Sequence, residues 1–318
     1  MKSVKSDNYD TSCEIHDVRT KFQYTFSNYP KAKVIKDLET AIYYQKTEEA
    51  FFWTGDLLCS GCILELWNLY IHILCKYIHI QHPKLPLYVY KKFVEFKEMV
   101  QACPNDLELR NMQPVRTLLF SMTLILSETK KQTLLDPMSF KFKFEEVFTD
   151  LRAPNLDYLT PFFKEGDPKE LFVPLNEFVY HLTETKNKTK LSYWMDWILC
   201  YDEKCIKEKK PLVSVEREGI PHLYQNVVWI LFEIFLSHPE PLRKRTVEAL
   251  MGLFAIRYKP CQNKKKREIL TFCIVLFMEE TLPYHLPLVE RGEIFGPLQR
   301  NIELIFKELK KSEVHALL

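Results

Sequence analysis

The sequence is poor in glycine, with only seven in 318 residues. Loops that hold phosphates and sharp strand-to-helix turns depend on glycine, because its backbone reaches positive φ without strain and lets a ligand approach closely. The seven glycines never form the spacings G-x-G-x-x-G or G-x-x-x-x-G-K-[ST]. We therefore do not expect a dinucleotide-binding fold or a P-loop NTPase.

Composition and charge indicate a folded chain without a strong field of either sign. Hydrophobic residues make up 47% and aromatic residues 14%, more than a disordered chain carries. The 44 Lys and Arg nearly balance the 42 Asp and Glu. Overall charge therefore does not favour binding to nucleic acid, and only a local basic patch could do so.

No stretch has the apolar length of a membrane helix, which needs about 20 residues. The longest apolar segments, Ile269 to Met278 and Val227 to Leu236, predict buried helices instead. The polar start, Met1 to Ser12, lacks the apolar region of a secretory signal, and the nine cysteines form no regular framework. We expect reduced thiols, no membrane insertion, and a cytoplasmic or nuclear location.

Hydrophobic periodicity predicts an all-α fold, a multi-helix bundle or array in two helical halves. Between residues 134 and 174 the helical pattern breaks into short apolar pieces separated by five prolines. These features predict an N-terminal arm over residues 1–29, a helical domain over 30–133, a proline-rich connection over 134–174, and a second helical domain over 175–318. The arm could lie on the first domain through Phe22, Tyr24 and Phe26, or serve as an exposed interaction segment.

The segment from Cys62 to Ile80 predicts the central helix of the first half. It is apolar nearly all round, so Trp67 and Leu74 should be deeply buried. Its polar residues form one narrow stripe that includes His72 and His79. The stripe is either the wet edge of a buried helix, or its His72 and His79 are buried polar residues or line a cleft.

Cys59-Ser60-Gly61-Cys62 is a C-x-x-C motif. A structural zinc site needs four ligands, usually from two such pairs, and this chain has no second one. We expect Cys59 and Cys62 to be reduced and free of metal, and we predict no metal and no cofactor. Zinc binding or redox chemistry at this motif is the alternative.

No pattern predicts a catalytic residue. The sequence has no G-x-S-x-G, no H-E-x-x-H and no EF-hand loop. The neighbouring acids Glu279 and Glu280 would point apart on a helix instead of converging. Glu233, the one charge inside Val227 to Leu236, must find a partner or face a cleft.

Two basic runs in the C-terminal half are candidate interaction sites. Arg243-Lys244-Arg245 is one, and Lys264-Lys265-Lys266-Arg267 is the other. The second run follows Asn263 where a helix should begin, a position open to phosphates or to an import receptor. Such runs can equally be solvated helix ends.

Several stretches resemble an uncharacterised protein family of nucleocytoplasmic large DNA viruses. The match covers mainly residues 31–90. The stretches that carry it are KVIKDLETAI (33–42), EEAFFW (48–53), LCSG (58–61), ELW (65–67) and KYIHIQHPKLP (76–86). The resemblance implies a viral protein of the infected cell or the virion, and it implies no activity and no site residues.

The sequence thus predicts a non-enzymatic helical interaction or scaffold protein of a large DNA virus, located in the host cytoplasm, the nucleus or the virion. We expect a protein partner. The first alternative is a DNA-associated replication or packaging factor that uses the basic runs. The second alternative is an enzyme of unfamiliar type, which a cleft of acids with perturbed pKa values would reveal.

Overall fold

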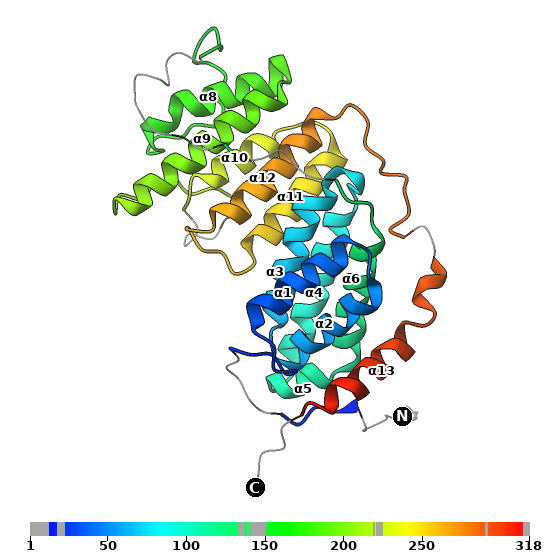
Figure 1. Ribbon diagram of the computed structural model, residues 1–318. Helices are drawn as coiled ribbons and strands as arrows, with labels where there is room; N and C mark the ends of the chain where they lie inside the picture. The colour runs from blue at the N-terminus through cyan, green and yellow to red at the C-terminus, as the bar shows by residue number, and fades with distance from the viewer. Residues whose placement is uncertain are drawn as a thin grey trace, which may run out of the picture. The chain divides into compact units, whose positions relative to one another are not determined.

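The computed structural model describes residues 13–17, 23–132, 137–138, 140, 151–218, 220, 225–289 and 292–313. In these residues the structure consists of helices joined by turns and loops, without a β-strand, so the all-α prediction is confirmed (Figure 1). None of the helices described combines the length and apolar composition that a membrane span requires. The α-helices are α1 (Lys31–Tyr43), α2 (Thr47–Cys59), α3 (Ile63–Ile73), α4 (Leu85–Ala102), α5 (Asp106–Asn111), α6 (Gln113–Glu128), α8 (Phe172–Tyr180), α9 (Lys188–Lys207), α10 (Val228–Leu236), α11 (Pro241–Ala255), α12 (Asn263–Met278) and α13 (Leu298–Lys310). The shorter turns are π-helical in η2 (Leu74–Ile78) and η5 (His181–Thr185), and 3₁₀ in η3 (His79–Gln81), η4 (Lys169–Leu171) and η7 (Gly292–Phe295).

The helices group into two compact units. The first contains the described residues of Met1–Leu74, Lys91–Lys131 and Leu286–Leu318, and the second those of Cys75–Tyr90 and Gln132–His285. This grouping differs from the expected division at 134–174. The described residues of the proline-rich segment belong to the second unit, and α13 belongs with the N-terminal helices.

Helix α13 joins the first unit because it complements α2 and α6, on which it packs. Its buried residues Leu298, Ile302, Phe306 and Leu309 recur every three or four positions, as on one face of a helix. In α2, Gly55 allows a close approach, because a Cβ there would lie 2.8 Å from Leu309 Cδ1. This match links residues far apart in sequence, which sequence order alone cannot reveal.

The N-terminal end of the described chain is fastened both to α5 and to the C-terminal end. Asn111 exchanges two hydrogen bonds with the main chain of Ile15, each 2.8 Å long. Glu313, which follows α13, accepts hydrogen bonds from the N–H groups of His16 and Asp17. We call residues 13–17 together with α13 and Glu313 the terminal clasp.

Two buried arginines complete the terminal clasp. Arg110 donates through Nη1 to the carbonyl oxygens of Cys59 (3.1 Å) and Asp17 (3.3 Å). Arg116 donates through Nη2 to the carbonyl of Cys13 at 3.1 Å. These bonds satisfy main-chain oxygens that burial would otherwise leave unpaired.

The turn at residues 25–29 lies on α2. Phe26 is buried, and its N–H donates to Ser60 Oγ at 2.7 Å. The N–H of Ser27 donates to Asp56 Oδ1 at 2.8 Å. Tyr24 is exposed, and Phe22 lies outside the described residues. Of the three expected anchors, Phe26 therefore performs that role.

The segment from 62 to 80 has the buried centre that the sequence predicts. Trp67 and Leu74 are both 0% exposed. The Trp67 ring packs edge-on against Phe93 with centroids 5.1 Å apart, and against Phe96 at 5.6 Å. Burial of so large a side chain contributes strongly to the stability of the first unit.

The polar stripe does not continue to the end of this segment. His72 is half-buried and lies 3.1 Å from Glu39 Oε1, whereas His79 is buried. The α-helix ends at Ile73, and the π turn η2 shifts the angular spacing of the residues that follow. Of the open interpretations, the wet edge therefore does not hold at His79, which is a buried polar residue whose Nε2 lies 3.0 Å from the carbonyl oxygen of Gln132. Burial lowers the pKa of His79 to about 4.

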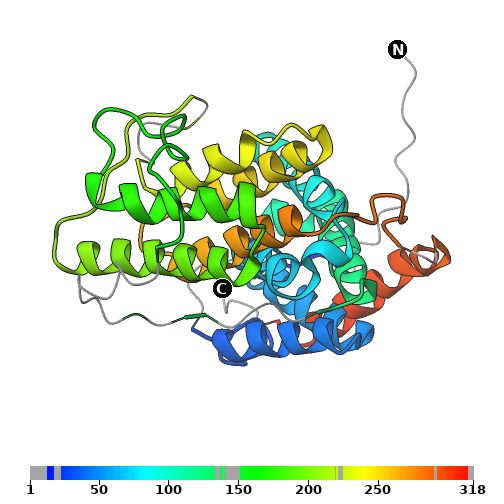
Figure 2. The same cartoon turned by 90° about the horizontal axis from the view of Figure 1, so that it is seen from above.

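The second unit is centred on α12. This helix packs against α9, α10 and α11, and its residues from Ile269 to Leu276 are fully buried (Figures 1 and 2). Figure 2 shows α8 and α9 running side by side next to it. The two longest apolar segments of the sequence are thus buried helices, α10 and α12, as predicted.

Candidate functional site

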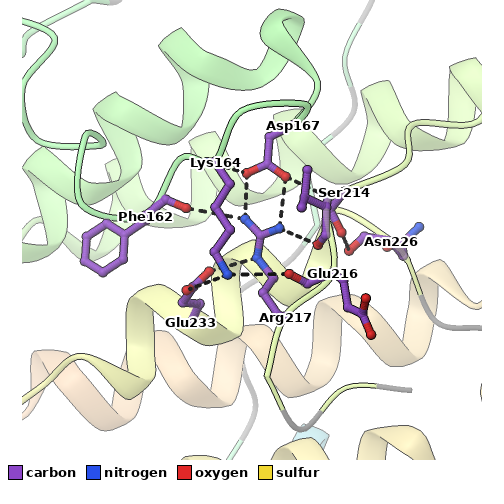
Figure 3. A network of polar contacts seen from close by, with 9 residues as sticks. Phe162, Lys164, Asp167, Ser214, Glu216, Arg217, Asn226 and Glu233 are labelled. Atoms are coloured by element: carbon purple, nitrogen blue, oxygen red, sulfur yellow. Dashed lines mark hydrogen bonds and ion pairs between the residues drawn. The ribbon is translucent and has the colours of Figure 1, made fainter. Parts of the chain in front are cut away.

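Glu233 finds a partner in a polar network of the second unit (Figure 3). Its Oε2 accepts a 2.8 Å hydrogen bond from Arg217 Nε, and Lys164 Nζ lies 3.6 Å from its Oε1. Arg217 also donates to both carboxylate oxygens of Asp167, at 2.9 and 2.7 Å. The remaining N–H groups of Arg217 donate to the carbonyls of Val215 and Phe162.

This network has a structural role. Burial acts to raise the pKa of Asp167, but the hydrogen bonds from Arg217, Lys164 and Val215 outweigh it and hold that pKa below its ordinary value. Every donor of the Arg217 guanidinium is engaged, so none is left for a substrate. The network ties the loops around Phe162 and Val215 to α10, and Glu233 is part of that tie.

Two residues of the second basic run point inward. Lys266 Nζ lies 2.7 Å from Asp202 Oδ2, and both side chains are 0% exposed. Arg267 Nε donates to Asp196 Oδ1 at 2.9 Å. A buried cation of this kind is held by its partner and cannot contact a phosphate backbone.

The other two residues of that run differ in exposure. Lys265 Nζ donates to the carbonyl of Ile256 at 2.7 Å, and burial lowers the pKa of Lys265 to about 8. Lys264 is 72% exposed and lies 4.0 Å from Glu268. The expectation that the whole run is open to a partner is therefore wrong for Lys265, Lys266 and Arg267.

The C-x-x-C motif forms the turn between α2 and α3. Cys59 and Cys62 are buried free thiols, and burial raises the pKa of both, that of Cys62 to about 11. Gly61 adopts φ +68°, the left-handed conformation that glycine tolerates best. Among the residues that the structure describes, no group of three or more His, Cys, Asp or Glu is placed to hold a metal ion.

A pocket of about 810 Å³ lies in the second unit, where η5, α10 and α12 end and α11 begins. Phe277 packs on its neighbours here: its ring stacks on Phe235 with centroids 5.3 Å apart and meets His238 at 4.7 Å. The lining residues are Leu182, Thr183, Lys186, Ile234, Phe235, Ser237, His238, Pro239, Glu240, Arg243, Phe277, Met278, Glu279 and Glu280.

Arg243, from the first basic run, is built into this pocket. It is buried, its Nε binds the Glu240 carboxylate, and its Nη1 binds the carbonyl of Leu276. Its Nη2 donates to the carbonyls of Glu279 (2.8 Å) and Glu280 (3.2 Å). Arg243 thus closes the C-terminal end of α12, and only Lys244 and Arg245 of that run are exposed.

His238 is held as a neutral ring. Its Nδ1 accepts a hydrogen bond from the N–H of Glu240 at 3.2 Å. Burial, followed by the positive charge of Arg243, lowers the pKa of His238 below its ordinary value. At neutral pH this imidazole therefore adds no positive charge to the pocket.

The rim of the pocket carries charges that make no ion pair. Glu279, Glu280 and Lys186 form no side-chain hydrogen bond or ion pair with any residue in the described ranges. Lys186 has φ +48°, directly after the π turn η5. Left-handed non-glycine residues and π turns are both enriched at functional sites.

Sequence reasoning missed most of this pocket. Glu279 and Glu280 were expected to point apart on a helix, but α12 ends at Met278 and neither residue is helical. The sequence offered one signal, since the end of α10 at Leu236 is close to Arg243, but nothing in the pattern connected Arg243 to the end of α12.

Comparison with known proteins gives no match, since no protein-family model, no curated protein and no solved structure is significantly similar to this chain.

Proposed function

We propose that this chain is a non-enzymatic interaction protein of a large DNA virus, and that it acts in the infected cell or the virion by receiving part of a partner protein in the pocket of the second unit. The observation that carries the proposal is the combination in this pocket of aromatic rings with unpaired rim charges. Protein-binding pockets typically combine an apolar contact surface with a few polar groups that set orientation.

The hydroxyl and imidazole groups of the pocket support binding over catalysis. Ser237 Oγ donates to the carbonyl of Ile234 at 2.7 Å, and Thr183 Oγ1 donates to that of Val179 at 3.1 Å. A nucleophile needs a base within hydrogen-bond reach, whereas these hydroxyls are bound to their own helices. His238 Nδ1 is occupied by a main-chain N–H.

A peptide-display selection tests the proposal. A random peptide library is panned on the wild-type protein and on Thr183→Trp, which narrows the mouth of the pocket from an exposed position. Thr189→Trp is the matched control, since Thr189 is also exposed and is not part of the lining. We expect peptides that bind wild type and Thr189→Trp but not Thr183→Trp. A selection without such peptides would contradict the proposal.

A further inference from the structure

Three helical segments end at the pocket, and one begins there. η5 ends at Thr185, α10 at Leu236 and α12 at Met278, while α11 begins at Pro241. A helix C-terminus carries partial negative charge on its unpaired carbonyls, and an N-terminus carries partial positive charge. The ends of η5, α10 and α12 therefore contribute partial negative charge at this pocket, of which the part at α12 is bound by Arg243.

Arg243 shows directly that the backbone here stabilises a cation. Its guanidinium is 7% exposed and collects carbonyl oxygens of Leu276, Glu279 and Glu280 at the end of α12. Burying a positive charge so far is costly without such acceptors. The same end of α12 supplies the pocket wall.

The side chains add to this negative charge. Glu240 is neutralised by its ion pair with Arg243. The remaining charged residues of the lining are two carboxylates, Glu279 and Glu280, and one cation, Lys186. Negative charge is therefore in excess. His238 adds little positive charge at neutral pH, because burial and the charge of Arg243 lower its pKa.

An anionic ligand would fit poorly. Its partners would be Lys186 and the first N–H groups of α11, because every other positive group of the lining is already bound. It would also meet the unpaired carboxylates of Glu279 and Glu280. A cation gains from those carboxylates and from the ends of η5 and α10, whereas the end of α12 is already bound by Arg243.

We propose that the pocket binds the cationic side chain of an arginine or a lysine in a partner protein. The proposal rests on the proposed function, because it names the chemistry of the partner at that same pocket. The long aliphatic stem of either residue would lie along Phe277, with its charged end at the rim carboxylates.

Defined peptides test the proposal. Fluorescein-labelled Gly-Ser-X-Ser-Gly peptides, with X as Arg, Lys, Gln or Glu, are titrated with the full chain at constant ionic strength and followed by anisotropy. We expect the Arg and Lys peptides to bind, and the Gln and Glu peptides to bind at least about tenfold more weakly.

Charge variants locate the binding. Glu279→Gln/Glu280→Gln should weaken the Arg and Lys peptides about tenfold. Glu48→Gln/Glu49→Gln, an adjacent exposed pair in the first unit, removes the same charge and should leave binding unchanged. Equal binding of the Arg peptide to wild type and Glu279→Gln/Glu280→Gln would overturn the proposal, as would preference for the Glu peptide.

The two proposals fail differently. If display selects pocket-dependent peptides that lack basic residues, the interaction function stands and the cation preference falls. If display selects no pocket-dependent peptide and the Arg peptide does not bind, both proposals fall.

Discussion

Two sets of buried cations, one in each unit, are held in different ways. In the terminal clasp of the first unit, Arg116 donates to the main-chain carbonyls of Arg110 and Cys13. In the second, Lys266, Arg267 and Arg217 are each held by an aspartate. A carbonyl is neutral at every pH, whereas an aspartate can lose its charge. The first arrangement fastens chain ends, and the second makes stability depend on charge pairs.

The largest expected effect comes from breaking the buried pair of the second unit. Lys266→Ala leaves the Asp202 carboxylate fully buried without its cation, and its Oδ1 already lacks a hydrogen-bond partner in the part of the chain that is described. We expect a loss of about 3–5 kcal/mol in the free energy of unfolding, measured by urea denaturation. The exposed control Lys244→Ala should change it by less than about 0.5 kcal/mol. A loss for Lys266→Ala as small as that of the control would show that Asp202 is not held as a charged partner.

A smaller loss should follow from the corresponding change in the first unit. Arg116→Met keeps the apolar contact with Phe306, whose ring lies 3.7 Å from the guanidinium carbon, but removes the donor to the carbonyl of Cys13. The acceptors left behind are mainly neutral, so we expect a loss of about 1–3 kcal/mol by the same measurement. If Arg116→Met proved more damaging than Lys266→Ala, the contrast between carbonyl and carboxylate partners would be mistaken.

Acidification should change the stability of the two units in opposite directions through one carboxyl in each, Asp167 in the second unit and Asp56 in the first. The folded-state pKa of Asp167 is depressed, so its stabilising contribution is complete above the unfolded value of 3.8 and is lost as pH falls through the folded value. Burial raises the pKa of Asp56 above 3.8, so its protonation on acidification favours the folded first unit.

Region-resolved hydrogen exchange, corrected for the intrinsic rate, measures this difference. Between pH 7 and pH 3, Asp167→Asn should reduce the loss of protection around α10, whereas Asp56→Asn should remove a gain around α2. Identical pH profiles for wild type and both variants would show that neither carboxyl contributes to the acid response.

The smallest effect is expected at the exposed cations. The triple variant Lys244→Gln/Arg245→Gln/Lys264→Gln removes side chains on the surface, so each change should alter stability by less than about 0.5 kcal/mol. The same variant tests the DNA-associated alternative. A salt-dependent mobility shift of labelled DNA that wild type shows and the variant loses would favour that alternative over the interaction function.

Sequence patterns located the helices well, because burial of one helix face makes apolar residues recur every three or four positions. Trp67 and Leu74 are buried as that periodicity requires. The pattern failed at His79, where a π turn changes the angle per residue, since nothing in the local sequence signals that turn. It also could not indicate which helices α13 packs against, because that contact depends on the missing side chain of Gly55.

The candidate site was harder to predict, because the sequence gives the charge of a side chain but not the direction in which that side chain points. Lys264 and Lys266 are two positions apart on α12, and one is exposed while the other is fully buried against Asp202. Glu279 and Glu280 depend on where α12 ends, and boundaries are the least reliable part of a sequence-based reading. Arg243 was recognised as a cation, but its role in closing α12 required the fold.

The terminal clasp has a consequence for how the chain is made. A ribosome releases α1, α2 and α6 early, but the groove that α13 fills and the hydrogen bonds from Glu313 to His16 and Asp17 need the last part of the chain. Domains usually fold as units in order of synthesis, and contacts between distant residues slow the process. The second unit, Cys75–Tyr90 and Gln132–His285, leaves the ribosome whole while the first is still incomplete. The unit begun first in translation is therefore finished last, and its apolar groove over Gly55 stays exposed to chaperones until α13 arrives.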